Sequence, residues 1–177
     1  MLNKILVAID KSVASQYAFN TALEMAQAFG AELIVVYVLD VFDPASPKRP
    51  AYRPIDGYSF ELDSVLRKNY ERQWVEFVDY YNALLWQKQT EAEAVGVTAS
   101  HLQSYGRPGP AICKTAKDSH VDLVILGSHG RSGLRELILG SVSNYVMHHA
   151  PCSVLVVHEQ STTEPIAETD DLATVAS

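Results

Sequence analysis

Short runs of consecutive apolar residues alternate in this chain with longer stretches whose apolar residues recur every three or four positions. Runs at 4–9, 33–38, 121–126 and 153–157, and a weaker one at 97–104, are typical of strands buried on both faces. The stretches between them have the period of helices. This alternation predicts an α/β fold: an open, doubly wound sheet of five parallel strands with helices on both faces, similar to a Rossmann fold.

The first helix is predicted between two clear end signals. Ser12 is a suitable N-cap residue, and Gly30 is the glycine that commonly follows a helix. The apolar residues between them form a stripe with a period of 3.6 residues, which is expected to face the sheet. The residues of this stripe are Val13, Ala14, Tyr17, Ala18, Ala22, Met25, Ala26 and Phe29.

The longest helix is predicted over residues 60–95, with Gly96 ending it. Its apolar residues are Leu62, Val65, Leu66, Tyr70, Trp74, Phe77, Tyr81, Leu84 and Leu85. Their helical spacing favours a core role for the aromatic side chains over a stacking platform. A helix of this length is also able to extend past the sheet and meet a partner. Shorter helices are predicted after Pro108 and over 141–149.

Two segments fall outside this pattern. Residues 40–58 contain four prolines and three cationic residues, and they predict an irregular loop insertion that is either a mobile surface segment or a lid. Residues 159–177 contain five acidic residues and no Lys or Arg, which predicts a disordered tail. The folded domain is therefore expected to span residues 1–158.

Composition and charge exclude several classes of function. The chain has 177 residues and a net charge of −7, and subtracting the five acidic residues of the tail leaves −2. A nearly neutral domain lacks the basic stripe that nucleic-acid binding requires, and no run approaches the ~20 apolar residues of a membrane span. Cys113 and Cys152 have neither metal nor redox spacing, and no signal peptide precedes the first strand. We expect a cytoplasmic protein.

The most informative motif follows the run at 121–126. Gly127 and Gly130 are separated by two residues, and nine residues later come Gly140 and Ser141. Glycines at the end of a parallel strand, followed by the start of a helix, allow backbone N–H groups to approach a phosphate. The alternative is that these glycines only form turns and caps. We favour nucleotide phosphate binding because ligands in such sheets lie at the carboxyl ends of the strands.

Each residue near the motif has a functional and a structural interpretation. Backbone N–H groups at Gly127 and Gly130 are expected at the ribose-phosphate link, and those of 140–143, with the Ser141 and Ser143 hydroxyls, at the terminal phosphates. An idle, exposed Ser143 is equally compatible with the sequence. Asp10, at the end of the first strand, is suited to a ribose hydroxyl, an adenine amine or a metal, or to capping a helix. If the first and fourth strands are neighbours, Asp10 and the glycine motif face one crevice.

Other motifs of catalysis are missing. The glycines have neither Walker A nor dinucleotide-fingerprint spacing, and no zinc or metalloprotease spacing occurs. His129 lies inside the motif, either touching the ligand or facing solvent. His148 and His149 are adjacent on a helix and therefore diverge, which suits its C-terminal dipole better than a metal. No general base or positioned cation for fast phosphoryl transfer is identifiable.

The chain resembles the universal stress protein family in its nucleotide-binding subgroup. Gly127, Gly130, Gly140 and Ser141 match every fixed position of that subgroup's motif, and the likeness extends over residues 2–157. The resemblance implies strand order 3-2-1-4-5, contact of Asp10 with the nucleoside, and contact of the Val38 backbone with adenine. The nucleotide-site residues are then Ala8, Ile9, Asp10, Val38, Leu126, Gly127, His129, Gly130, Gly140, Ser141, Val142 and Ser143.

The resemblance also implies a homodimer joined through the last strand, at Val154, Leu155, Val156 and Val157. The leading hypothesis is a cytoplasmic stress-response regulator that binds ATP or AMP and acts on other proteins. The alternative is a slow ATPase or phosphotransferase that uses the same pocket, with Mg²⁺ held by the phosphates rather than by side chains. A nucleotide-free interaction protein is a third, weaker hypothesis.

Overall fold

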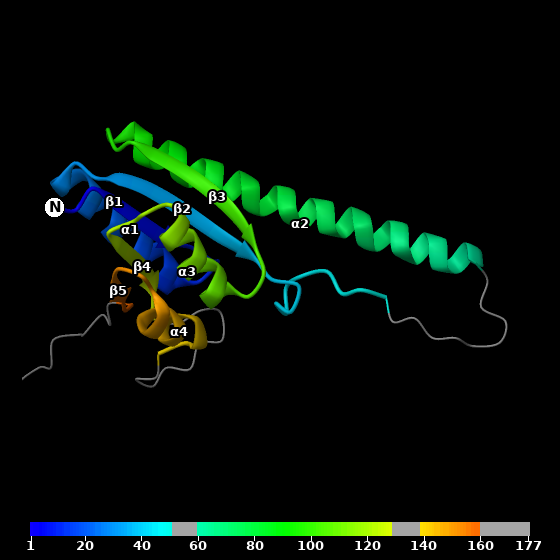
Figure 1. Ribbon diagram of the computed structural model, residues 1–177. Coiled ribbons are helices and arrows are strands. Elements are labelled where there is room, and N and C mark those ends of the chain that lie inside the picture. The colour runs from blue at the N-terminus through cyan, green and yellow to red at the C-terminus, as the bar shows by residue number, and fades with distance from the viewer. Residues whose placement is uncertain (51–59, 129–138, 160–177) are drawn as a thin grey trace, which may run out of the picture.

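The computed structural model describes residues 1–50, 60–128 and 139–159. The elements, in chain order, are β1 (Lys4–Ala8), α1 (Val13–Phe29), β2 (Glu32–Leu39), α2 (Phe60–Ala94), β3 (Ala99–Tyr105), α3 (Pro108–Asp118), β4 (Leu123–Gly127), α4 (Ser141–His149) and β5 (Ser153–Val157). The strands form one parallel sheet in the order β3-β2-β1-β4-β5. The predicted fold and strand order are confirmed (Figure 1).

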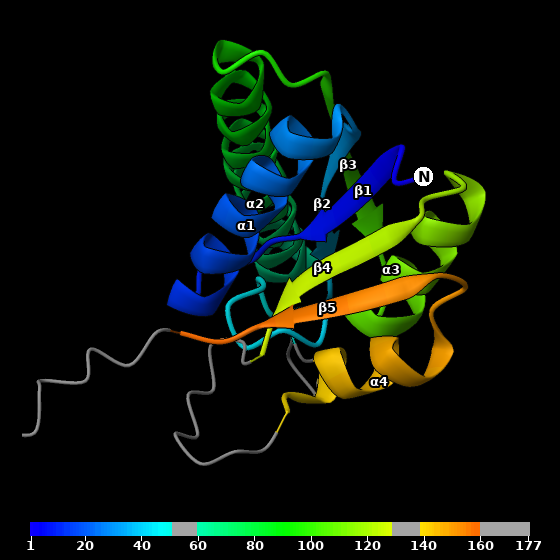
Figure 2. The same cartoon turned by 90° about the vertical axis from the view of Figure 1, so that its left-hand side faces the viewer.

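Helices cover both faces of the sheet, as predicted (Figure 2). On one face, α1 and α2 pack on Ile5 and Val7 of β1, on Ile9 just after it, and on alternate residues of β2. On the other face, α3 and α4 pack on Leu6 and on the intervening residues. Because successive strand residues point to opposite faces and both faces are covered, the three central strands β1, β2 and β4 are apolar at nearly every position, whereas the edge strand β3 is more polar.

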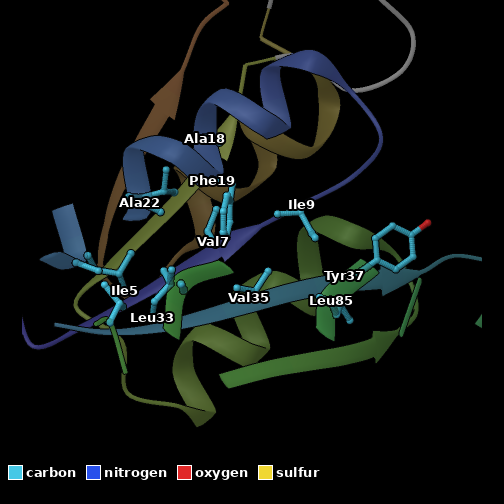
Figure 3. Close-up of a cluster of buried hydrophobic side chains, with 14 of the residues drawn as sticks. Ile5, Val7, Ile9, Ala18, Phe19, Ala22, Leu33, Val35, Tyr37 and Leu85 are labelled. Atoms are coloured by element: carbon cyan, nitrogen blue, oxygen red, sulfur yellow. The ribbon is translucent and has the colours of Figure 1, made fainter. Parts of the chain in front are cut away.

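The face of α1 that meets the sheet differs from the predicted stripe. Val13 and Phe29 are each 60% exposed and Tyr17 is 36% exposed, so their assignment to the buried stripe was wrong. The buried residues are Ala14, Ser15, Ala18, Phe19, Ala22 and Ala26. Alanines one turn apart allow the helix to approach the strands closely, and Phe19 fills the remaining space above Val7 (Figure 3).

The predicted end signals of α1 are confirmed. The N–H of Ser15 donates to the Ser12 hydroxyl at 3.1 Å. Gly30 has a φ of 65°, the left-handed conformation that favours glycine, and the N–H of Ala31 returns to the carbonyl of Ala26. Gly96, with a φ of 84°, ends the segment after α2 in the same way.

The core role predicted for the aromatic residues of α2 holds for only part of the helix. Tyr81 and Leu85 are fully buried, and Tyr81 stacks on Tyr37 with ring centroids 3.6 Å apart. Tyr70 and Trp74 are only half-buried, and no described residue before Tyr81 in this helix is fully buried. The prediction was wrong for the first half, since it lies beyond the sheet (Figure 1).

Cys113 and Cys152 are half-buried on the α3–α4 face, and burial raises the pKa of each thiol, so neither is a reactive thiolate at neutral pH. Within the described ranges, no helix combines the length and apolar character needed to cross a bilayer.

One carboxylate joins the starts of β1 and β4. Oδ2 of Asp122 accepts from the N–H groups of Asn3 and Lys4, at 2.8 and 3.0 Å. These two backbone hydrogen bonds lower the pKa of the Asp122 carboxyl below its ordinary value.

Replacing this carboxylate should make the protein less stable in a pH-dependent way. A lowered folded-state pKa contributes stability above the unfolded pKa of about 3.9, and that stability is lost as pH falls through the folded value. Asp122→Asn should therefore lower the urea midpoint at neutral pH, and the difference from wild type should shrink in acid. Asp79→Asn, which removes an exposed carboxylate of α2, controls for net charge. A difference that is constant with pH would contradict the assignment.

Candidate functional site

A pocket of about 590 Å³ opens at the carboxyl ends of β1, β2 and β4, beside the start of α4. It lies where the strand order reverses, because β1 connects towards β2 on one side while β4 lies on its other side. Ten of the twelve predicted site residues line it: Ala8, Ile9, Asp10, Val38, Leu126, Gly127, Gly140, Ser141, Val142 and Ser143. The other two, His129 and Gly130, lie outside the described residues.

The turn after β1 is held by a ring of hydrogen bonds. The N–H of Asp10 donates to Oγ of Ser15 at 2.8 Å. Oδ1 of Asp10 accepts from the N–H and the hydroxyl of Ser12, at 2.8 and 2.5 Å. Asp10 thus supports the helix cap with one oxygen, as the structural interpretation expected. Asp10 lines the pocket, and no donor among the described residues meets its other oxygen, Oδ2.

Gly127 is a glycine for a different reason from the one expected. A Cβ there would lie 2.8 Å from the carbonyl carbon of Ala14 and 2.9 Å from its Cβ. The close passage of α1 over the end of β4 therefore excludes any side chain. The carbonyl of Gly127 also accepts a hydrogen bond from the Ser143 hydroxyl at 2.7 Å. At this position packing, rather than the approach of an anion, requires the glycine.

The first turn of α4 supplies the polar end of the pocket. The N–H of Gly140 donates to the carbonyl of Ser128 at 2.8 Å, and its carbonyl accepts from Asn144 at 2.9 Å. This leaves the N–H groups of Ser141, Val142 and Ser143, which have no acceptor within the helix. They carry the positive end of the helix dipole, so this turn is suited to an anion.

The two serines of this turn have different environments. Ser141 is exposed, with its side chain available to a ligand. Ser143 is 2% exposed, and its hydroxyl hydrogen is directed to the Gly127 carbonyl. The hydroxyl of Ser143 therefore fastens α4 to β4, which leaves mainly its backbone N–H for an anion. The sequence left this role of Ser143 unidentified.

The opposite wall comes from the start of the predicted loop insertion. Asp40, Phe42 and Asp43 line the pocket. Oδ1 of Asp40 accepts from the N–H of Phe42 at 2.9 Å, and buried Ser46 donates to the carbonyl of Val41 at 2.9 Å. Residues 40–46 thus form a compact, hydrogen-bonded turn. The signal in the sequence was the pair Asp40 and Asp43, because an aspartate often accepts a hydrogen bond from the backbone two residues later in a turn. The rest of the insertion for which a lid is one expectation, residues 51–58, lies outside the described residues.

The base end of the pocket is apolar. Val38 of β2 and Leu126 of β4 are buried on the same face of the sheet, on either side of β1, and Ile112 of α3 belongs to the same apolar cluster. The pocket thus has an apolar half over β2 and a half lined by N–H groups over α4. Neither His148 nor His149 is among the described residues that line the pocket. Nδ1 of His149 contacts the carbonyl of Tyr145 at 2.8 Å, within α4.

Comparison with known proteins places this geometry in one family. A profile of the universal stress protein family matches residues 1–158. A universal stress protein of Synechocystis is 33% identical over 154 residues, which are 87% of this chain and 96% of that protein. The solved structure of universal stress protein UspA from Lactobacillus plantarum is 30% identical, with a TM-score of 0.64, covering 88% of this chain and 97% of that one.

Two further solved structures share the fold and hold nucleotides. One is a universal stress protein in complex with cAMP, at 24% identity and a TM-score of 0.59, covering 90% of this chain and 99% of that one. The other is an Arabidopsis thaliana protein of this family with AMP bound, at 19% identity and a TM-score of 0.57, covering 93% and 97%. From its sequence, its strand order and these likenesses, the chain belongs to the universal stress protein family.

Proposed function

We propose that this protein binds an adenine nucleotide, ATP or AMP, in the pocket between β1, β2 and α4. The observation that carries the proposal is the convergence of all ten described site residues on one cavity, although they come from four separate segments of the chain. A cavity of about 590 Å³ lies in the size range of small-molecule sites, about 300–1,000 Å³.

The two ends of the pocket suit the two ends of a nucleotide. Adenine would lie against the apolar end at Val38 and Ile112, with Asp10 Oδ2 facing the ribose. The phosphates would accept hydrogen bonds from the N–H groups of Ser141, Val142 and Ser143. Two proteins of the same fold hold AMP and cAMP. These structures are examples of the fold binding such nucleotides. For this chain, the proposal rests on the residues that line its own pocket.

We further propose that the bound nucleotide regulates interactions with other proteins during stress, in the cytoplasm. The pocket offers positioning groups, and one oxygen of Asp10 is already engaged in the cap of α1. Mg²⁺, if needed, would be held by the phosphates of ATP. A slow ATPase or phosphotransferase in the same pocket is the alternative that the experiments below distinguish.

We also propose a homodimer through β5, which is an edge strand. The carbonyl of Val157 accepts from Ser128 at 2.8 Å, on the β4 side. Because residues in a strand point alternately to the two sides, the N–H and C=O groups of Val154 and Val156 point away from β4. An edge strand of this kind is able to pair with its own copy across a two-fold axis.

The phosphate end can be tested with one exposed residue. Ser141→Glu should weaken ATP binding by roughly tenfold or more, because its carboxylate would repel the phosphates. The same change should leave the fold at least as stable, since an acidic residue is favourable in a first helical turn. Ser141→Gln, similar in size and neutral, is the matched control. Equal affinities of both variants and wild type in titration calorimetry would place the phosphates elsewhere.

The rate of ATP hydrolysis distinguishes a regulatory protein from an enzyme. Steady-state ATP hydrolysis with Mg²⁺ should stay well below about 1 per second, the lower end of ordinary enzymes. Asp10→Asn is the diagnostic variant, because its amide oxygen is still able to accept from Ser12 and keep the cap of α1. A rate of ordinary size that disappears in this variant would favour the enzymatic alternative.

The dimer interface can be tested at the outward side of β5. Val156→Pro removes an outward-pointing N–H while the pairing with β4 is retained, so sedimentation velocity should show loss of the β5 dimer with nucleotide binding largely intact. Val156→Thr keeps both the N–H and the side-chain volume and should still dimerise. Val156→Pro with unchanged assembly would place the interface on another surface.

A further inference from the structure

Two aspartates that line the pocket are held in the same way. Oδ1 of Asp40 accepts from the N–H of Phe42 at 2.9 Å, just as Oδ1 of Asp10 accepts from the N–H of Ser12 at 2.8 Å. In both turns a backbone donor two residues later fixes the carboxylate. Asp40 is half-buried, and no donor among the described residues meets its Oδ2. The proposed ribose contact uses Asp10, so an acceptor oxygen of Asp40 is left without a role at the other end of the pocket.

The stagger of two strands turns backbone groups towards that end of the pocket. The last paired residues of β1 and β2 are Ala8 and Val36, and the N–H of Ile9 donates to the carbonyl of Val36 at 2.9 Å. Backbone groups of a strand alternate between its two sides, so those of Val38 point to the same side as those of Val36. Since β1 ends before β2 does, the N–H and carbonyl of Val38 face the pocket that this residue lines.

An exposed aromatic ring lies beside these groups. Phe42 lines the pocket although it is 73% exposed. The guanidinium carbon of Arg107 lies 5.7 Å from the centroid of the ring, a distance at which a cation stabilises an aromatic face. The backbone of Phe42 is held by Asp40, so the ring and the carboxylate belong to one hydrogen-bonded turn. A flat ring at the mouth of a pocket is suited to stacking on a nucleic-acid base.

Position 6 of a purine distinguishes adenine from guanine and hypoxanthine. Adenine carries an amino group there, which donates hydrogen bonds, whereas the other two carry an oxo group, which only accepts them. An ionised carboxylate is also only an acceptor. An aspartate beside this position therefore favours adenine and repels the oxo purines.

We propose that the turn 40–46 selects the base of the nucleotide: Oδ2 of Asp40 accepts from the 6-amino group of adenine, and the ring of Phe42 stacks on the base. The inference rests on the proposed nucleotide site and identifies the side chains of this chain that determine its specificity. The two hydrogens of the amino group then have two acceptors, the carbonyl of Val38 and Oδ2 of Asp40. Stacking contributes affinity for any purine, whereas the carboxylate supplies the preference for adenine.

Asp40→Asn tests the recognition of position 6. The N–H of Phe42 requires an acceptor, so the amide oxygen of the asparagine should stay on it and direct the NH2 group to the base. By titration calorimetry on the full chain, wild type should bind AMP at least about tenfold more tightly than IMP, which carries the 6-oxo group. In Asp40→Asn this ratio should fall by about tenfold, since the amide donates to an oxo group and not to an amino group.

Asp43→Asn is the matched control, because Asp43 lines the same pocket and the change removes the same charge. Oδ1 of Asp43 accepts from the N–H of Ala45 at 2.7 Å, and an asparagine oxygen is able to do the same. Loss of a carboxylate acts on the phosphate, which AMP and IMP share, so the AMP-to-IMP ratio should stay at its wild-type value. An equal ratio in wild type, Asp40→Asn and Asp43→Asn would overturn the role of Asp40.

Phe42→Leu tests the stacking. Leucine keeps an apolar side chain but has no flat face, so AMP and IMP should both bind about tenfold more weakly, while Phe42→Tyr should bind as wild type does. Tyr105→Leu is the control, because Tyr105 is 63% exposed and is not among the described residues that line the pocket. Unchanged AMP binding in Phe42→Leu, or an equal loss in Tyr105→Leu, would overturn the stacking.

These results are separable from a failure of the proposed function. A wild type that does not bind AMP would overturn the nucleotide site itself. AMP binding that Ser141→Glu weakens, with an AMP-to-IMP ratio that Asp40→Asn leaves unchanged, would support the site and overturn the selection of the base by this turn.

Discussion

The site depends on the close passage of α1 over the end of β4. Ala14 and Gly127 approach so closely that no side chain fits between their backbones. This contact brings the turn of Asp10 and Ser12 beside the first turn of α4, which Ser143 in turn fastens to the carbonyl of Gly127. The pocket is thus assembled at the ends of β1 and β4 by packing and by two serine hydroxyls, before any ligand contributes.

Much of this arrangement could be predicted from the sequence, because it depends on local patterns. Apolar runs identify the strands, Ser12 and Gly30 mark the ends of α1, and the glycine motif marks the edge of the sheet where the pocket opens. What could not be predicted depends on contacts between distant segments. The need for glycine at position 127 comes from Ala14, more than a hundred residues earlier, and no periodicity contains that information.

The predictions about buried faces that were wrong also failed because burial depends on contacts between distant segments. Hydrophobicity alone placed Val13 and Tyr17 on the buried face of α1, whereas close approach to the strands selects the alanines and the buried Ser15. Likewise, the stripe of α2 has one period throughout, and only the length of the sheet determines where burial ends. The sequence did not predict that the turn at 40–46, with the hydrogen bonds of Asp40 and Ser46, forms part of the pocket wall.

The hydrogen bond from Gly140 to Ser128 has a consequence for how this family can diversify. It joins the two positions at which the chain leaves β4 and returns to α4, so the intervening stretch starts and finishes at one point of the domain. A connection anchored in this way can change in length and composition at little cost to the framework, since loop-closure entropy grows only slowly with length. The lining of the pocket could thus be altered in evolution, or by loop grafting, without rebuilding the sheet beneath it.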